Sequence, residues 1–151
     1  MTAPARAAGV ERLLIRRYDV GAALTPLDLR RKEARTGVAV VACMDSRLGV
    51  EAMFGLRPGD ADVIRNAGGC VTRDTLRSLR LSQLRGGTRE IVLVHHEDCA
   101  ALGGDPAEDL TACLSLLRDA GELPHTELVR GFLYTREGAL REVRPARAGN
   151  P

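Results

Sequence analysis

The chain has 151 residues, of which 44% are hydrophobic and 28% charged, and its formal net charge is +2. This length suits one compact domain with a buried core, and we expect no second full domain. The small net charge argues against nucleic acid or a membrane surface as a partner. The absence of Trp and the 3% aromatic content argue against a platform for stacking bases.

Neither a membrane span nor a secretion signal is evident in the sequence. No apolar run approaches the roughly 20 residues that a span needs, and the start of the chain intersperses charges among its apolar residues. We therefore expect a cytoplasmic protein. Its four cysteines are then expected to be metal ligands, nucleophiles or core residues, because disulfide frameworks are rare in that compartment.

Residues 1–36 are predicted to form a helical arm that precedes the core domain. Apolar side chains recur there at helical spacing, at Val10, Leu13, Leu14 and Tyr18. Such an arm often packs on a partner subunit, although it can also cover the core of its own chain.

The core domain is expected to span residues 37–145 and to contain short strands separated by helices. The apolar runs at 38–43 and 90–96 are typical of strands buried on both faces, and 61–69 contains a shorter strand. A closing hairpin is predicted from 131–135 and 139–143. Residues 146–151 are expected to form a frayed tail.

Two helices are predicted between these strands. The first, within 72–87, places Leu76, Leu79 and Leu84 near one face and stops at two glycines. The second, within 105–121, begins with Asp105 as N-cap. Strands that alternate with helices indicate an α/β fold: a mainly parallel sheet flanked by helices on both faces, with an added antiparallel edge strand.

Two of the predicted strands end on residues that can bind a metal ion. The first ends on Cys43; the third ends on His96, and Cys99 follows three residues later. If the two strands are neighbours, these side chains converge at the carboxyl edge of the sheet, where α/β proteins bind ligands. Two thiolates and one imidazole suit Zn²⁺ and leave a fourth position open, as in catalytic zinc sites.

Alternative roles exist for the other histidine and cysteines near this pattern. His95 competes with His96, but the three-residue spacing to Cys99 favours His96, and His95 would then face the opposite side of the sheet as a core or supporting residue. Cys70 and Cys113 are assigned to packing.

Asp45 and Arg47 follow Cys43 at every second position, so in an extended segment all three side chains face the same way. Asp45 could fill the open metal position. Arg47 could instead hold that carboxylate off the metal through a bidentate pair. An ordinary surface ion pair is the alternative interpretation.

Taken together, these residues resemble the β-class carbonic anhydrases, particularly their compact bacterial branch. The segment "ACMDSR" resembles the family's C-x-D-x-R motif and "HEDC" its H-x-x-C motif. The segment "LRPGDADVIRNAGG" resembles the stretch between the two motifs, and "RGFLYTREGALREV" resembles the closing strand. The likeness covers roughly residues 37–145. Two positions depart from the family pattern, Ala100 where Gly is usual and Asp62 where His is common.

The resemblance implies one Zn²⁺ per chain, bound by Cys43, His96 and Cys99, with Asp45 and Arg47 as catalytic residues. It implies reversible hydration of CO₂ to bicarbonate and a proton by zinc-bound hydroxide. Gly68 and Gly69 are our candidates for substrate-binding residues. The partners implied are a small-molecule substrate and a second copy of the chain, as a homodimer or a dimer of dimers.

In some family members the Asp moves onto zinc at lower pH, and we expect Asp45 to do likewise. Two alternatives remain: hydrolysis of carbonyl sulfide or carbon disulfide on the same fold, and a non-catalytic zinc protein. A nucleotide-binding module ranks last, because the sequence lacks the glycine-rich phosphate motifs.

Overall fold

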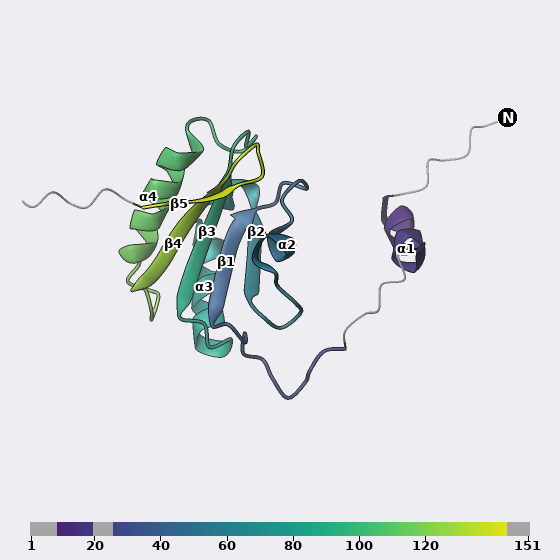
Figure 1. The fold of residues 1–151 in the computed structure, drawn as a ribbon. Helices are drawn as coiled ribbons and strands as arrows, with labels where there is room; N and C mark the ends of the chain where they lie inside the picture. The colour runs from purple at the N-terminus through teal and green to yellow at the C-terminus, as the bar shows by residue number, and fades with distance from the viewer. Residues whose placement is uncertain (1–8, 20–25, 145–151) are drawn as a thin grey trace, which may run out of the picture.

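The computed structural model describes residues 9–19 and 26–144 (Figure 1). The predicted tail at 146–151 lies outside the described residues. The proposed division into an arm at 1–36 and a core at 37–145 remains a prediction. Among the described residues, no helix is long and apolar enough to cross a membrane.

A five-stranded sheet with the order β2-β1-β3-β4-β5 forms the centre of the fold. Its strands are β1 (Val38–Cys43), β2 (Asp62–Asn66), β3 (Glu90–His96), β4 (Leu128–Tyr134) and β5 (Leu140–Val143). The first four are parallel, and β5 returns antiparallel to β4. This confirms the predicted fold class, including the antiparallel edge strand.

Helices lie on both faces of the sheet, as predicted, but they cover the faces unequally. The helices α3 (Arg73–Arg85) and α4 (Pro106–Arg118) pack on one face. Of the helices that the structure describes, the short α2 (Val50–Phe54) is the one that packs on the other. The sequence analysis did not predict α2 or the 3-10 turn η1 (Ala67–Gly69).

Strand alternation divides the apolar side chains between the two faces. Val41 and Leu93 contribute to the core beneath α3 and α4, whereas Val40 and Val94 pack with α2 on the opposite face. Because of this alternation, the adjacent residues His95 and His96 point to opposite faces.

The predicted apolar face of α3 was wrong at one position. Leu79 is fully buried and Leu76 packs against the core, but Leu84 is 53% exposed. At 100° per residue, Leu84 lies five residues and therefore 140° away from Leu79. The polar residues Ser82 and Gln83 occupy the buried face there instead.

Both α4 and the N-terminal helix form where the sequence predicted them. The N-cap Asp105 accepts a hydrogen bond from the backbone N–H of Ala107 at 3.0 Å. Helix α1 (Gly9–Asp19) lies apart from the sheet in Figure 1. Its apolar residues Leu13 and Leu14 are 64% and 51% exposed. The side chain of Tyr18 lies outside what the structure describes.

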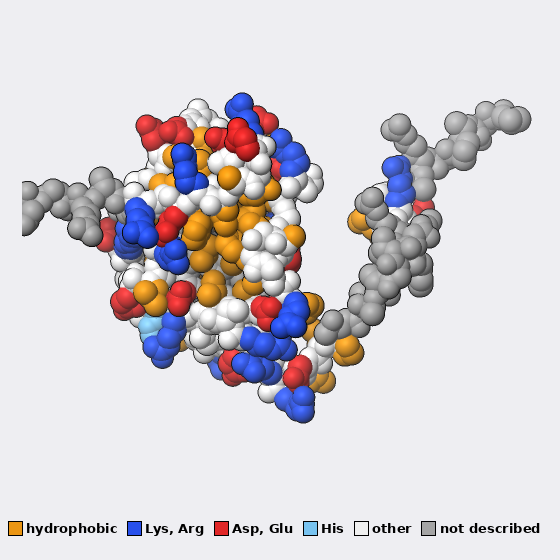
Figure 2. Space-filling view, in the orientation of Figure 1, with side chains coloured by type: hydrophobic (Ala, Val, Ile, Leu, Met, Phe, Trp, Pro, Cys, Tyr) orange, Lys and Arg blue, Asp and Glu red, His pale blue; other side chains and the backbone are white. Residues whose placement is uncertain are grey.

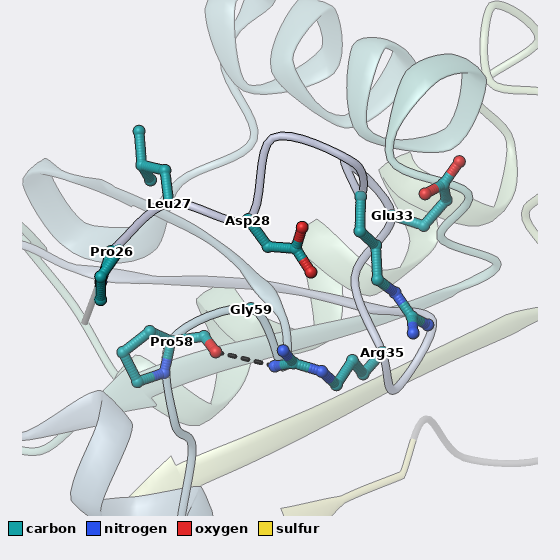
Figure 3. Close-up of a pocket in the computed structure, with 8 residues that line it drawn as sticks. Pro26, Leu27, Asp28, Glu33, Arg35, Pro58 and Gly59 are labelled. Carbon is teal, nitrogen blue, oxygen red and sulfur yellow. Dashed lines mark hydrogen bonds between the residues drawn. The ribbon is translucent and has the colours of Figure 1, made fainter.

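Segment 26–36 is fixed to the amino end of the sheet by Arg35 (Figure 3). Its guanidinium donates to the carbonyl of Pro58 at 2.8 Å, and its backbone N–H donates to the carbonyl of Gly59 at 3.0 Å. The pocket between these loops lies at the start of β1 and β2, and its lining includes no Cys or His.

Candidate metal centre

The carboxyl ends of β1 and β3 bring together the three residues predicted as metal ligands. The two strands are direct neighbours in the sheet. One ligand atom each from Cys43, His96 and Cys99 lies within 4.8 Å of the others, and the two sulfurs are 3.8 Å apart. Because β1 and β3 are neighbours, the three predicted ligands lie close together, as the sequence analysis expected.

The imidazole of His96 is oriented as a metal ligand would be. Its Nδ1 lies 2.8 Å from the backbone carbonyl oxygen of Glu97. A carbonyl only accepts hydrogen bonds, so Nδ1 carries the proton and Nε2 presents a lone pair. Nε2 is buried, and no described residue donates a hydrogen bond to it. Buried polar atoms normally have a partner, so this nitrogen fits a cation that the protein atoms alone do not supply.

The sulfur atoms have surroundings that suit a cation. The backbone N–H of Gly68 donates to the sulfur of Cys43 at 3.3 Å. Burial, together with the neighbouring Cys43 thiol, raises the pKa of Cys99 above its ordinary value. A cation would offset this effect, because it compensates for the charge of the Cys99 thiolate.

Asp45 and Arg47 form a tight pair at the edge of this cluster. The Nε of Arg47 lies 3.0 Å from Oδ1 of Asp45, and its Nη2 lies 2.7 Å from Oδ2. Hydrogen bonds from the side chain and then the backbone of Arg47 hold the pKa of Asp45 well below its usual range. Oδ2 of Asp45 also lies 3.8 Å from Nε2 of His96. The carboxylate thus stays ionised at the edge of the cluster, restrained by Arg47.

Arg47 has a second partner that the sequence analysis missed. Its Nη1 donates to the Asp98 carboxylate at 3.2 Å and its Nη2 donates to the Asp98 carbonyl at 3.1 Å. Asp98 has a positive φ of 58°, which is uncommon outside glycine. One guanidinium therefore links the loop after β1 to the turn that carries Cys99.

Arg65 was also missed, although its position gave a signal. It is the charged residue that follows the apolar pair Val63 and Ile64 in β2, and it is paired in register with Ala42. Its Nε donates to the carbonyl of Cys43 at 3.0 Å and its Nη2 donates to that of Asp45 at 2.8 Å. Arg65 thus fixes the backbone on which a predicted ligand and the carboxylate sit.

Gly68 and Gly69 form the turn that packs against Cys43. Both have positive φ values, of 82° and 65°. A Cβ on Gly69 would lie 3.0 Å from the carbonyl oxygen of Val94 and 3.1 Å from the backbone nitrogen of Cys43. The turn therefore has a role in close backbone packing, and a contact with substrate remains a prediction.

His95 and the two remaining cysteines lie outside this cluster. His95 is fully buried on the α4 face. Cys113 is buried in the same core as Leu110 and Leu114. Cys70 is half-buried, and burial raises the pKa of its thiol. Asp62, where the family commonly has His, accepts a hydrogen bond from Ser82 at 2.6 Å and belongs to the packing of β2 on α3.

A cavity of about 220 Å³ opens beside the candidate centre. It is lined by His96 and Tyr134 at the ends of β3 and β4, and by loop residues that include Arg47, Leu48 and Arg136. The carboxyl edge of the sheet therefore combines a candidate metal site with a small space beside it.

Comparison with known proteins decides the family. The family model described as carbonic anhydrase matches residues 38–128, which is more than half of the chain. The chain belongs to the β-carbonic anhydrase family. A carbonic anhydrase from Streptococcus mutans has a closely similar structure, with a TM-score of 0.81 at 29% identity, covering 93% of this chain and 100% of that one.

Curated relatives carry two different activities in their names. Beta-carbonic anhydrase 1 of Mycobacterium tuberculosis is 58% identical over 65 residues, covering 43% of this chain and 40% of that protein. A carbon disulfide hydrolase of Acidithiobacillus thiooxidans is 45% identical over 120 residues, covering 69% of this chain and 54% of that protein. The chain thus spans about half the length of these curated relatives, or less.

Proposed function

We propose that this protein is a zinc-dependent carbonic anhydrase that hydrates CO₂ reversibly to bicarbonate and a proton. The observation that carries the proposal is the free, buried Nε2 of His96 between two thiols and beside an Arg-held carboxylate. The family assignment supports it.

Cys43, His96 and Cys99 are the proposed ligands of one Zn²⁺. Two thiolates and one neutral imidazole balance the charge of the ion and leave one coordination position open. Zinc bound there would lower the pKa of a coordinated water so that a nucleophile is available near neutral pH. Hydration of CO₂ needs such a nucleophile and little else from the protein.

Asp45 and Arg47 are proposed to keep that open position available. A carboxylate that entered it would add a negative charge and occupy the place of the nucleophile. The contacts from Arg47 restrain Asp45, which can then act as a hydrogen-bond acceptor at the edge of the site. Movement of Asp45 onto the metal at low pH is proposed to close the site, and it requires that these contacts break.

A carbon disulfide hydrolase is the second candidate, because a relative named for that activity is 45% identical over 120 residues. Steady-state rates with the two substrates separate the candidates, with proton release measured for CO₂ and sulfide release for CS₂. We expect faster turnover of CO₂, and Asp45→Asn should lower that rate at unchanged zinc content. Cys70→Ser is the matched control for loss of a thiol outside the centre. A higher rate with CS₂ would favour the second candidate.

We further propose that the protein assembles as a homodimer, or as a dimer of dimers, through the face of the sheet that carries the short α2. Figure 2 shows hydrophobic side chains gathered at the centre of this face. An apolar groove of about 290 Å³ there is lined by residues that include Val38, Val40, Phe54, Leu56, Val92 and Phe132. A continuous apolar surface of this kind is typical of an interface.

The amphipathic helix α1, with its exposed leucines, would pack on the partner subunit. Sedimentation should show a dimer for the wild-type chain and a monomer for Val92→Glu. A monomeric wild-type chain would contradict this assembly. For location we propose the cytoplasm, where the four thiols would stay reduced.

A further inference from the structure

We propose that Asp98 is a positioning residue for the metal centre: it holds the guanidinium of Arg47 in the orientation that restrains the Asp45 carboxylate. This inference rests on the proposed function, because it concerns how the open coordination position is kept free. Asp98 is neither a predicted ligand nor a member of the Asp45–Arg47 pair, and it acts on the centre through Arg47.

Arg47 contacts both aspartates at once, along two different edges of its guanidinium. Its Nε and Nη2 lie 3.0 and 2.7 Å from the carboxylate oxygens of Asp45. Its Nη1 donates to the carboxylate of Asp98 at 3.2 Å, and Nη2 also donates to the Asp98 carbonyl at 3.1 Å. A guanidinium carries enough N–H groups in one plane to make all these contacts together. The two aspartates therefore do not compete for Arg47, and together they fix the plane of its guanidinium.

The exposure of Arg47 explains why a second partner matters. Its side chain is 61% exposed, whereas that of Asp45 is 17% exposed. A long side chain in water loses much of the benefit of a single ion pair, because it must give up its rotamer freedom. When Asp98 already holds one edge of the guanidinium, the other edge faces Asp45 without this loss.

The backbone of Asp98 adopts a conformation that serves this contact. Its φ is 58°, and it is the one non-glycine residue with a positive φ in the part of the chain that the structure describes. In this conformation both its carboxylate and its carbonyl face Arg47. Strained backbone that the surroundings hold in place is concentrated at functional sites. Asp and Asn tolerate this conformation better than most residues do.

The turn that carries Asp98 is itself anchored to the sheet. The backbone N–H of Glu97 donates to the carbonyl of Tyr134 at 3.0 Å. The carboxylate of Glu97 accepts a hydrogen bond from the backbone N–H of Arg136 at 2.8 Å. Asp98 therefore offers Arg47 a fixed point at the end of β3 and β4.

The first test is the mobility of the Arg47 side chain, measured in the full chain by ¹⁵N relaxation of its Nε–H group. We expect an order parameter near that of rigid backbone in the wild type, about 0.85, and a value below about 0.6 in Asp98→Gly. Glycine keeps the positive φ and the carbonyl, so this variant removes the carboxylate alone. Asp98→Asn, which also tolerates the backbone conformation, should show the same direction of change if Asp98→Gly fails to fold.

The matched control is Asp74→Ala. Asp74 is an 81% exposed aspartate that lies 3.8 Å from Arg77 on α3, away from the metal centre. This variant should leave both the mobility of Arg47 and the rate of CO₂ hydration at the wild-type values.

The second test is kinetic and asks whether Asp98 acts through Arg47. Asp98→Gly should lower kcat for CO₂ hydration about three- to tenfold at unchanged zinc content. KM should stay the same, because fewer sites are open while each open site is unaltered. In Arg47→Ala protein, Asp98→Gly should cause no further loss of rate.

Two results would overturn the positioning role: an Arg47 side chain as rigid in Asp98→Gly as in the wild type, or a further loss of rate when Asp98→Gly is added to Arg47→Ala. A wild-type chain that binds zinc but does not hydrate CO₂ would overturn the proposed function instead. Loss of Arg47 order in Asp98→Gly would still support the positioning role in that case.

Discussion

Replacement of Gly69 by Ala tests how closely the turn behind the metal centre is fitted to the sheet. Gly69 has a φ of 65°, a conformation that costs an L-residue about 1–2 kcal/mol. The added Cβ would also crowd backbone atoms of Val94, Ala42 and Cys43 at 3.0–3.1 Å. Crowding in a packed core costs about 1–3 kcal/mol.

Together these effects should lower the free energy of unfolding of Gly69→Ala by about 2–5 kcal/mol. For a chain of this size each kcal/mol shifts the melting temperature by about 2–4 °C, so we expect a decrease of about 4–20 °C by circular dichroism. Retention of zinc should fall as well, because the backbone nitrogen of Cys43 must move.

Gly121→Ala is the matched control. Gly121 does not have a positive φ, and a Cβ there meets nothing within 4 Å. Its melting temperature should stay close to that of the wild type. A Gly69→Ala protein as stable as Gly121→Ala would refute the reasoning.

Three further predictions follow from the described contacts. Arg47→Ala should release Asp45 towards the metal and lower the CO₂ hydration rate at least tenfold, with zinc content unchanged; a wild-type rate would show that Arg47 does not keep the site open. Glu142 has its pKa lowered from 4.5 to about 2 by the paired Arg side chains of the β4-β5 hairpin. The ionised Glu142 therefore stabilises the fold fully above about pH 4.5, and this stabilisation is lost as the pH falls through 2. Glu142→Gln should weaken the pH dependence of the melting temperature between these values. An unchanged pH dependence would contradict this role of Glu142. Leu79→Ala should cost about 2–5 kcal/mol of unfolding free energy in denaturant titrations, whereas Leu84→Ala should change it by less than about 0.5 kcal/mol; equal effects would contradict the burial of α3.

The sequence predicted β1 and β3 well because these strands are buried along nearly their whole length. The runs at 38–43 and 90–96 are continuous and β-branched, so their limits are clear, and β1 and β3 match them. The N-cap Asp105 gave the start of α4, and Gly86 and Gly87 marked the end of α3. The short α2 was missed because five residues carry too little periodicity to be recognised.

The residues of the candidate site that could be predicted are those at the end of a predicted strand, next to a polar motif. Cys43 and His96 end neighbouring parallel strands, and parallel topology alone places them together. Arg65 and Asp98 were not predicted, because their contacts depend on side-chain direction across the sheet edge and on a positive φ. Leu84 was placed wrongly because it lies 140° from Leu79 around the helix, and angular position decides burial.

The most direct test of the central claim is stopped-flow CO₂ hydration on zinc-quantified protein, comparing the wild type with Cys99→Ser. We predict fast, zinc-dependent hydration in the wild type, lost in Cys99→Ser together with one equivalent of zinc. Hydration at the uncatalysed rate by fully loaded wild type, or a wild-type rate in Cys99→Ser, would contradict it.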